Sequence, residues 1–232
     1  MSRLKRKKKV FLFCNKFLIE SLKRELGNIF EITEGKTVTQ IKEVKPYAII
    51  FDKETESILK YSTKKTYLMY LSTPEVFSGI LELGFQSKDM PNPHTKEGEE
   101  IYRCETLIKE RGHSLILRLA SLITYEDLEE IKKSIIHRIA LDNRVQLYPM
   151  YPPDVARVID TLLSLESKGV VHLRGSERTT QYKIGLILSD IFKLIPPVSS
   201  FDKGGDINLK LAGIVLPTII RQVITDFYRL KG

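Results

Sequence analysis

The chain has 232 residues, 42% of them hydrophobic and 28% charged, with a net charge of +8, which is typical of a globular protein and excludes a largely disordered chain. No apolar run approaches the roughly 20 residues that cross a bilayer, and no cleavable signal follows the basic start, so we expect a cytoplasmic protein. The two cysteines lie far apart and suit neither a disulfide framework nor a zinc site, so no metal is expected.

The first nine residues, MSRLKRKKK, form a basic arm whose six positive charges leave the rest of the chain close to neutral. The charged residues are Arg3, Lys5, Arg6, Lys7, Lys8 and Lys9. Such a cluster is typical of extensions that contact phosphates, so we expect association with RNA, a ribosome or another ribonucleoprotein through the arm. The alternative is a solvated tail that only aids solubility.

Residues 10–51 alternate between short apolar runs and segments with helical spacing. The expected elements are strands near 10–13, 29–32 and 47–51 and helices over 16–26 and 37–44. This β-α-β-α-β opening predicts a parallel sheet with right-handed crossovers. We therefore expect a three-layer α/β fold.

The rest of the chain continues the alternation. The expected strands lie near 67–71, 115–121 and 170–173. The expected helices run over 125–141, from Asp154 to Gly169, from Thr179 or Thr180 to Phe192, and over 214–230. The strands near residues 10, 29, 47, 67 and 115 should share one parallel sheet. The strand at 170–173 should belong to a smaller C-terminal lobe.

The stretch from Tyr148 to Phe192 carries an ordered set of residues at fixed spacing. They are Asp154, Val155, Ala156, Gly169, His172, Leu173, Gly175, Ser176, Glu177 and Tyr182. The set resembles the C-terminal part of the extended short-chain dehydrogenase/reductases, in particular the dTDP-4-dehydrorhamnose reductase branch. IKEVKPYAII at 41–50, STPEVFSG at 72–79 and LILRLAS at 115–121 resemble further strands of that family.

The resemblance runs from Val10 to Leu230 and implies a division of the chain. After the arm at 1–9, residues 10–141 should form a Rossmann-like domain. Residues 142–232 should form a lobe that resembles the part of the family that binds the sugar nucleotide. A composition rich in Lys, Glu, Arg and Ile and poor in Asn and Gln is typical of thermophilic proteins.

Of the family's three catalytic positions, this sequence retains the Ser/Thr and lacks the tyrosine and the lysine. Thr73 matches the family's catalytic Ser/Thr, which hydrogen-bonds the substrate carbonyl, although Ser72 and Thr73 could simply cap the end of a strand. The family then places Tyr-x-x-x-Lys on the next helix, but here Glu97 and Ile101 occupy those positions. No catalytic dyad is therefore expected. The Tyr61 to Lys65 match precedes Thr73, where the family's geometry would not use it.

The turn that binds the dinucleotide in the family is also altered. There, glycines let the backbone approach the pyrophosphate and open the helix N-terminus to it. Here the turn reads FCNKFLI over residues 13–19 and contains no glycine. We expect side chains, with Phe17 and Phe51 foremost, to fill the crevice, and we expect no cofactor.

Two functions follow from these observations. The main hypothesis is a non-catalytic, reductase-like pseudoenzyme that binds or scaffolds partners within a larger assembly, such as a ribonucleoprotein. The alternative is an NAD(P)-dependent dTDP-4-dehydrorhamnose reductase-like enzyme, or another enzyme that modifies nucleotide sugars. The missing glycines and dyad favour the first, and the retained Thr73 and C-terminal lobe favour the second.

Overall fold

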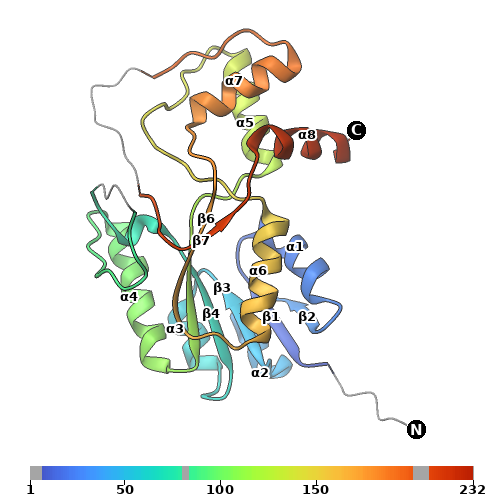
Figure 1. The fold of residues 1–232 in the computed structure, drawn as a ribbon. Helices are drawn as coiled ribbons and strands as arrows, with labels where there is room; N and C mark the ends of the chain where they lie inside the picture. Colours follow the sequence, from blue (N-terminus) through green and yellow to red (C-terminus); the bar gives the residue numbers. More distant parts are fainter. Residues whose placement is uncertain (1–6, 80–83, 201–208, 232) are drawn as a thin grey trace. The chain divides into compact units, whose positions relative to one another are not determined.

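The computed structural model describes residues 7–79, 84–200 and 209–231. Its strands in chain order are β1 (Lys9–Phe13), β2 (Glu31–Glu34), β3 (Ala48–Phe51), β4 (Tyr67–Ser72), β5 (Ser114–Leu119), β6 (Gly169–Gly175) and β7 (Ile214–Leu216). Within the described residues these strands form one sheet in the order β2-β1-β3-β4-β5-β6-β7 (Figure 1). The parallel pairs include β1 with β2, β1 with β3, β3 with β4, β4 with β5 and β6 with β7. The expected Rossmann-like α/β fold is confirmed.

The helices begin and end where local chemistry allows. They are α1 (Lys16–Leu26), α2 (Ile41–Val44), α3 (Thr55–Tyr61), α4 (Lys96–Arg111), α5 (Tyr125–Ile136), α6 (Pro152–Ser164), α7 (Gln181–Phe192) and α8 (Ile220–Lys231), with short 3-10 helices η1 (Val38–Gln40) and η2 (Pro74–Val76). The Thr95 hydroxyl, for example, accepts a hydrogen bond from the Gly98 amide at 3.0 Å and begins α4. Gly112 ends that helix at a φ of 74°, in the left-handed region that glycine adopts without strain.

The chain forms two compact units that are interleaved in sequence. The first unit comprises residues 1–76, 91–118 and 152–171, and the second comprises residues 77–90, 119–151 and 172–232. The boundary expected between residues 141 and 142 thus falls within a segment of the second unit. Lys9, which was assigned to the arm, is the first residue of β1.

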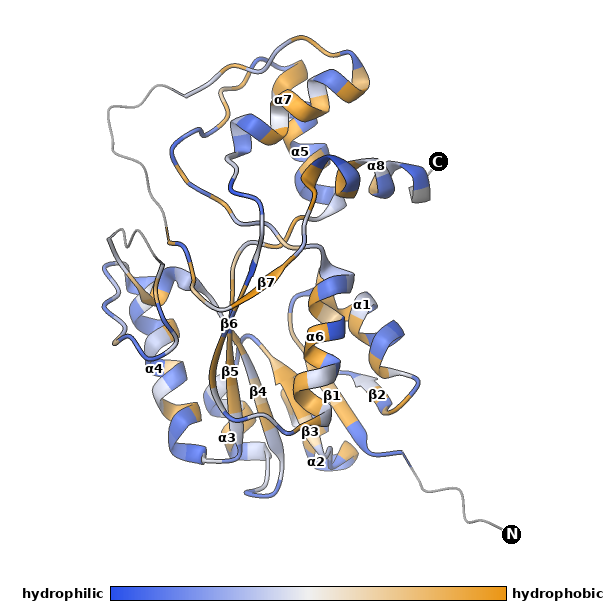
Figure 2. Ribbon diagram, viewed as in Figure 1, coloured by the Kyte–Doolittle hydropathy of each residue, from blue (hydrophilic) through white to orange (hydrophobic). Residues whose placement is uncertain are grey.

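The sheet of the first unit is covered on both faces by helices. Phe11, Ile49 and Phe51 point to one face and pack in a buried cluster with side chains of α3 and α4, such as Ile58 and Ile108. Successive strand residues point to opposite faces, so the intervening positions of β1 and β3 face α1 and α6, which pack against each other. Figure 2 shows β1 and β3 as predominantly hydrophobic, as expected for strands buried on both faces.

The second unit has a core of its own, formed by the apolar faces of α5, α7 and α8. Leu128, Ile184, Leu188 and Ile224 are all buried in it. Thr124 begins α5 with a capping box in which the Thr124 hydroxyl and the Asp127 carboxylate each accept a hydrogen bond from the other's backbone amide. Local sequence signals therefore define the start of this helix.

Two expected helices differ from the structure. The helix predicted over 214–230 begins only at Ile220, because Ile214, Val215 and Leu216 form β7 and Pro217 follows them. Two β-branched residues and a proline favour a strand over a helix, and β7 pairs with β6 in the register Leu173 to Ile214. The helix predicted over 125–141 ends at Ile136.

Candidate functional site

The first candidate site lies where the strand order of the first unit reverses. The order β2-β1-β3 means that the chain leaves β1 in one direction and β3 in the other. Open α/β sheets bind ligands outside the carboxyl ends of the strands at such a switch point. Cys14 and Asn15 follow β1 here, and Asp52 and Lys53 follow β3.

Asn15 and Asp52 are hydrogen-bonded to each other across this switch point. The Asn15 backbone amide donates to the Asp52 carboxylate over 2.7 Å. The Asn15 side chain in turn accepts a hydrogen bond from the Phe17 amide over 2.9 Å and so caps α1. The Leu18 and Ile19 amides donate to the Asn15 carbonyl over 3.0 and 3.3 Å. The amides of Asn15, Phe17, Leu18 and Ile19 are therefore all bonded to groups of the protein itself.

Of the predicted plugs, Phe51 lies elsewhere, and Phe17 lies in the first turn of α1. Phe51 is fully buried in the cluster below α3 and α4, with its ring 5.4 Å from that of Tyr70. Phe17 is half-buried, and the Lys16 ammonium lies 4.7 Å from its ring centre. At the start of α1 the Asn15 side chain caps the helix, and the Asp52 carboxylate accepts a hydrogen bond from the Asn15 amide.

The surroundings of Asp52 disfavour its charged form. Burial raises the pKa of the Asp52 carboxyl, and the hydrogen bond from Asn15 and the Lys53 ammonium oppose that rise only in part. Burial likewise raises the pKa of the neighbouring Cys14 thiol, and the Asp52 charge adds to that effect. The Asn15 amide is therefore not free for a dinucleotide pyrophosphate while the Asp52 carboxylate accepts its hydrogen bond, and no glycine opens the backbone of this turn.

The end of β4 carries the second group of predicted residues. The Ser72 hydroxyl donates to Glu105 over 2.7 Å, and Arg118 donates to both oxygens of the same carboxylate over 2.8 and 2.6 Å. Thr73, one position further on, is half-buried, and its hydroxyl accepts a hydrogen bond from the Glu75 amide over 3.3 Å. Both hydroxyls thus serve the local structure, and Thr73 remains partly accessible.

The positions expected for the catalytic dyad lie on α4. Glu97 is exposed in the first turn of the helix, and Ile101 packs against the core cluster of the first unit. Tyr61 and Lys65 precede β4, whereas Thr73 follows it, so this six-residue strand separates them by roughly 20 Å. The structure thus does not bring Tyr61 and Lys65 together with Thr73.

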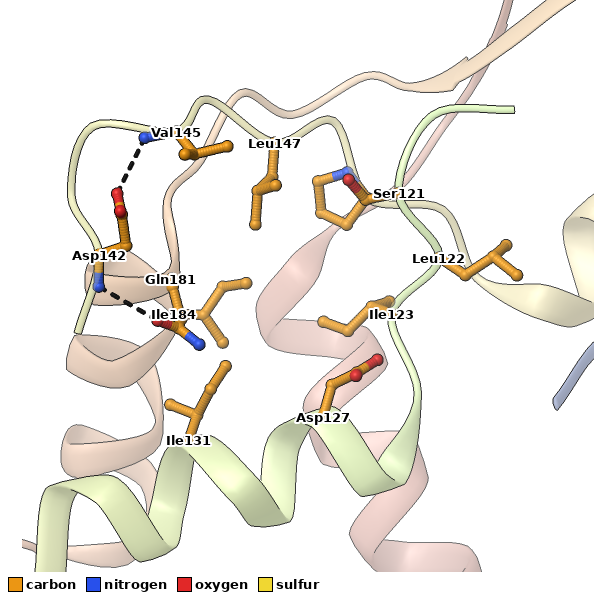
Figure 3. Close-up of a pocket in the computed structure, with 11 residues that line it drawn as sticks. Ser121, Leu122, Ile123, Asp127, Ile131, Asp142, Val145, Leu147, Gln181 and Ile184 are labelled. Carbon is orange, nitrogen blue, oxygen red and sulfur yellow. Dashed lines mark hydrogen bonds between the residues drawn. The ribbon is translucent and has the colours of Figure 1, made fainter. Parts of the chain in front are cut away.

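The second unit contains a pocket of about 330 Å³ that sequence reasoning missed (Figure 3). Its walls are largely apolar: Leu122, Ile123, Ile131, Val145, Leu147, Pro149 and Ile184. Its polar residues are Ser121, Asp127, Asp142 and Gln181. The capping box at residues 124–127 was the one local signal that marked part of this site.

The polar side chains of the pocket are held in place. The Asp142 carboxylate accepts hydrogen bonds from the Arg144 and Val145 amides over 2.7 and 3.0 Å, and these bonds, the one from Val145 foremost, lower the pKa of Asp142. The Gln181 side-chain oxygen accepts a bond from the Asp142 amide over 3.1 Å, which leaves the Gln181 NH₂ group as a donor. An apolar slot with fixed acceptors and a donor suits a flat heterocycle.

The basic arm is described from Lys7 onward. Lys7 donates to the Gly27 carbonyl over 2.8 Å, Lys8 lies 3.5 Å from the Glu166 carboxylate, and Lys9 lies 3.8 Å from that of Glu31. The other predicted phosphate contacts, Arg3, Lys5 and Arg6, lie outside the described residues. Among the described residues there is no cluster of metal-binding side chains and no helix long and apolar enough to cross a membrane.

Comparison with known proteins places the chain by its fold alone. No protein-family model matches the sequence, and no curated protein sequence matches it. Among solved structures, dTDP-4-dehydrorhamnose reductase from Bacillus anthracis, in complex with NADP, matches 97% of this chain and 99% of its own, with a TM-score of 0.79 and 17% identity. The Bordetella bronchiseptica enzyme WbmG, in complex with NAD, matches 100% of this chain and 97% of its own, with a TM-score of 0.77 and 12% identity.

A third similar structure holds a sugar nucleotide. UDP-glucose 4-epimerase from Thermotoga maritima, with UDP-glucose, matches 96% of this chain and 99% of its own, with a TM-score of 0.74 and 12% identity. The expectation of no cofactor is corrected by these neighbours, because proteins of this fold were solved with NADP and NAD bound. Nothing in the comparisons supports RNA binding or a ribonucleoprotein role. The resemblance to the dTDP-4-dehydrorhamnose reductases is confirmed at the level of the fold.

Proposed function

We propose that the chain is a nucleotide-sugar-binding protein of the dTDP-4-dehydrorhamnose reductase type. If it is an active enzyme, it would use NAD(P) as its cofactor. The observation that carries the proposal is the polar-rimmed pocket of about 330 Å³ in the second unit of a chain with this fold over its whole length. Pockets of this size and lining bind small molecules in many proteins. The comparisons support this reading better than a scaffold.

The chemistry of the pocket suits the base of a pyrimidine nucleotide. A thymine or uracil ring offers one N–H donor and two carbonyl acceptors on a flat apolar body. The carboxylates of Asp127 and Asp142 can accept from the ring N–H, and the Gln181 NH₂ group can donate to a carbonyl. Leu147, Ile184 and their apolar neighbours would cover the faces of the ring.

A second candidate is binding without catalysis, and the α4 side chains favour it. Glu97 stands where the family has the tyrosine that gives its proton to the carbonyl, and Ile101 has no charge to activate a proton donor. Thr73 would then be the one retained catalytic position. Such a protein would bind a nucleotide sugar and present it, or use it as a signal, without reducing it.

Calorimetric titration with dTDP and UDP tests the binding site. We expect wild-type protein to bind one of them and Gln181→Glu to bind it about tenfold more weakly, because the variant keeps the acceptor for the Asp142 amide but loses the donor. Gln86→Glu, an exposed change in the same unit, is the matched control and should leave binding unchanged. Absence of binding at millimolar nucleotide, or equal binding by both variants, would overturn the proposal.

An activity assay separates the two candidates. NADPH oxidation in the presence of a dTDP-4-dehydro sugar would establish the enzyme. Nucleotide binding without any turnover would establish the non-catalytic form.

A further inference from the structure

Rossmann-type folds bind the dinucleotide pyrophosphate at the turn from β1 to α1, and in this chain that turn already holds a carboxylate. Proteins of this fold were solved with NADP or NAD bound. In this chain the Asn15 amide at that place already donates to the Asp52 carboxylate over 2.7 Å. A carboxyl group of the protein therefore accepts a hydrogen bond from the turn where Rossmann-type folds bind the pyrophosphate.

The strand register explains why Asp52 reaches this amide. β1 and β3 are parallel neighbours, and Phe13 lies opposite Phe51. The residues that follow the two strands therefore emerge side by side. The Asn15 side chain also accepts a hydrogen bond from the Phe17 amide. The turn therefore cannot easily re-orient while the Asn15 amide is bonded to Asp52.

We infer that Asp52 is an internal anion that competes with the phosphates of a dinucleotide for the Asn15 amide, so that dinucleotide affinity rises when the carboxylate is neutralised or removed. Two anions at one amide repel each other, so the carboxylate and a phosphate cannot both occupy it without loss of affinity. A bound dinucleotide must then displace the carboxylate or bind together with a proton. The nature of the ligand rests on the proposed function, whereas the competition for the amide does not.

The surroundings leave room for the carboxylate to move. Asp52 borders a cavity of about 390 Å³ whose inner wall includes Thr55, Tyr70 and Cys104, all three buried. A carboxylate released from Asn15 can turn into this space. The cavity is also lined by three acidic side chains, Glu54, Glu56 and Glu100, and by two basic ones, Lys53 and Arg103. An ionised Asp52 therefore gains little electrostatic stabilisation by entering it.

The groups that face Asp52 set the direction of the pH dependence. They are the Cys14 thiol on the β1 side, the Tyr70 hydroxyl on β4 and the Lys53 ammonium beside it. Burial raises the pKa of both Cys14 and Tyr70, so both stay neutral at physiological pH, and Asp52 is the member of this group that takes up a proton as the pH falls. Dinucleotide affinity should therefore rise toward acidic pH.

Titration with NAD⁺ tests the inference, because its phosphates do not titrate between about pH 5.5 and 8. Asp52→Asn keeps an oxygen acceptor for Asn15 and removes the charge. At pH 8 we expect it to bind NAD⁺ about tenfold or more tightly than wild type. Wild-type affinity should rise as the pH is lowered, and the affinity of Asp52→Asn should change little. Glu43→Gln, which removes an exposed carboxylate of the same unit outside this cavity, should behave as wild type.

Three results would overturn the inference. They are an unchanged affinity in Asp52→Asn, an equal gain in Glu43→Gln, and no NAD⁺ binding by any form at millimolar concentration. If Asp52→Asn fails to fold, the pH series on wild type alone decides, because a flat profile rejects the competition. A result that rejects this inference would not affect the conclusion from the dTDP and UDP titrations, since those test the pocket of the second unit.

Discussion

At the scale of single residues, Glu105 and Arg118 form a buried ion pair with two hydrogen bonds between them. Both side chains are fully buried, and Arg118 donates to both oxygens of the carboxylate while Ser72 donates to one of them. The three residues come from α4, β5 and β4. The network thereby fixes the end of β4, where Thr73 follows.

Glu105→Gln should lower the free energy of unfolding by about 3 to 5 kcal/mol, because it leaves the Arg118 charge buried without its counter-charge. Urea denaturation measures this loss. Glu110→Gln, an exposed change on the same helix, is the control and should stay within about 0.5 kcal/mol of wild type. A loss below about 1 kcal/mol in Glu105→Gln would mean that the pair contributes little.

At the scale of elements, Glu166 ties together the starts of several strands. It lies just before β6, and its carboxylate accepts a hydrogen bond from the Tyr47 hydroxyl and lies 3.4 Å from His113 and 3.5 Å from Lys8. Lys8, Tyr47 and His113 immediately precede β1, β3 and β5. The cluster thus holds the amino ends of these strands at one edge of the first unit.

The cluster predicts a pH-dependent contribution to stability. The hydrogen bond from Tyr47, followed by that from His113, lowers the pKa of Glu166. A lowered carboxyl pKa stabilises the fold above the ordinary glutamate pKa, and the contribution is lost as the pH falls through the folded-state value. Tyr47→Phe should therefore cost about 1 kcal/mol at neutral pH, since the site is partly exposed, and less in acid.

Denaturant unfolding of wild type and Tyr47→Phe at several pH values measures this difference. Tyr61→Phe, a half-buried tyrosine of the same unit, is the control and should show a constant difference from wild type. A Tyr47→Phe deficit that stays the same down to about pH 3 would assign the loss to packing alone.

At the scale of the whole molecule, the basic arm and the folded body overlap in sequence. The Lys8 carbonyl accepts a bond from the Glu31 amide over 3.0 Å, and the Lys9 carbonyl accepts one from the Tyr47 amide over 2.9 Å. A deletion of residues 1–9 would therefore remove part of β1. The useful truncation ends at residue 6.

Removal of residues 2–6 should leave the melting temperature close to that of wild type and weaken any binding to polyanions. It removes Arg3, Lys5 and Arg6, so the slope of log affinity against log salt should become shallower by about 2 to 3. Binding of a single-stranded RNA at several salt concentrations measures both forms. Equal salt slopes would place the contact on the body, and no RNA binding by either form would reduce the arm to a solubility tail.

The layout of the fold and the residues that stand at the family's motif positions could be read from the sequence alone. Apolar runs separated by helical spacing predicted the strands β1 to β5 and their parallel direction, because burial on both faces leaves a continuous apolar run. The glycine-free turn at residues 13–19 and the Glu97 and Ile101 positions could likewise be read without a structure, since they depend only on which side chain stands at a given place.

Which side chains contact one another could be read only from the packing of the whole fold. Asn15 and Asp52 are 37 positions apart, and their bond exists because β1 and β3 are neighbours in register, which no local pattern specifies. The pairing of Glu105 with Arg118 and the pocket in the second unit depend in the same way on elements that are distant in sequence. Periodicity reports which face of an element is buried, whereas a binding site is made of side chains that only the packing of whole elements brings together.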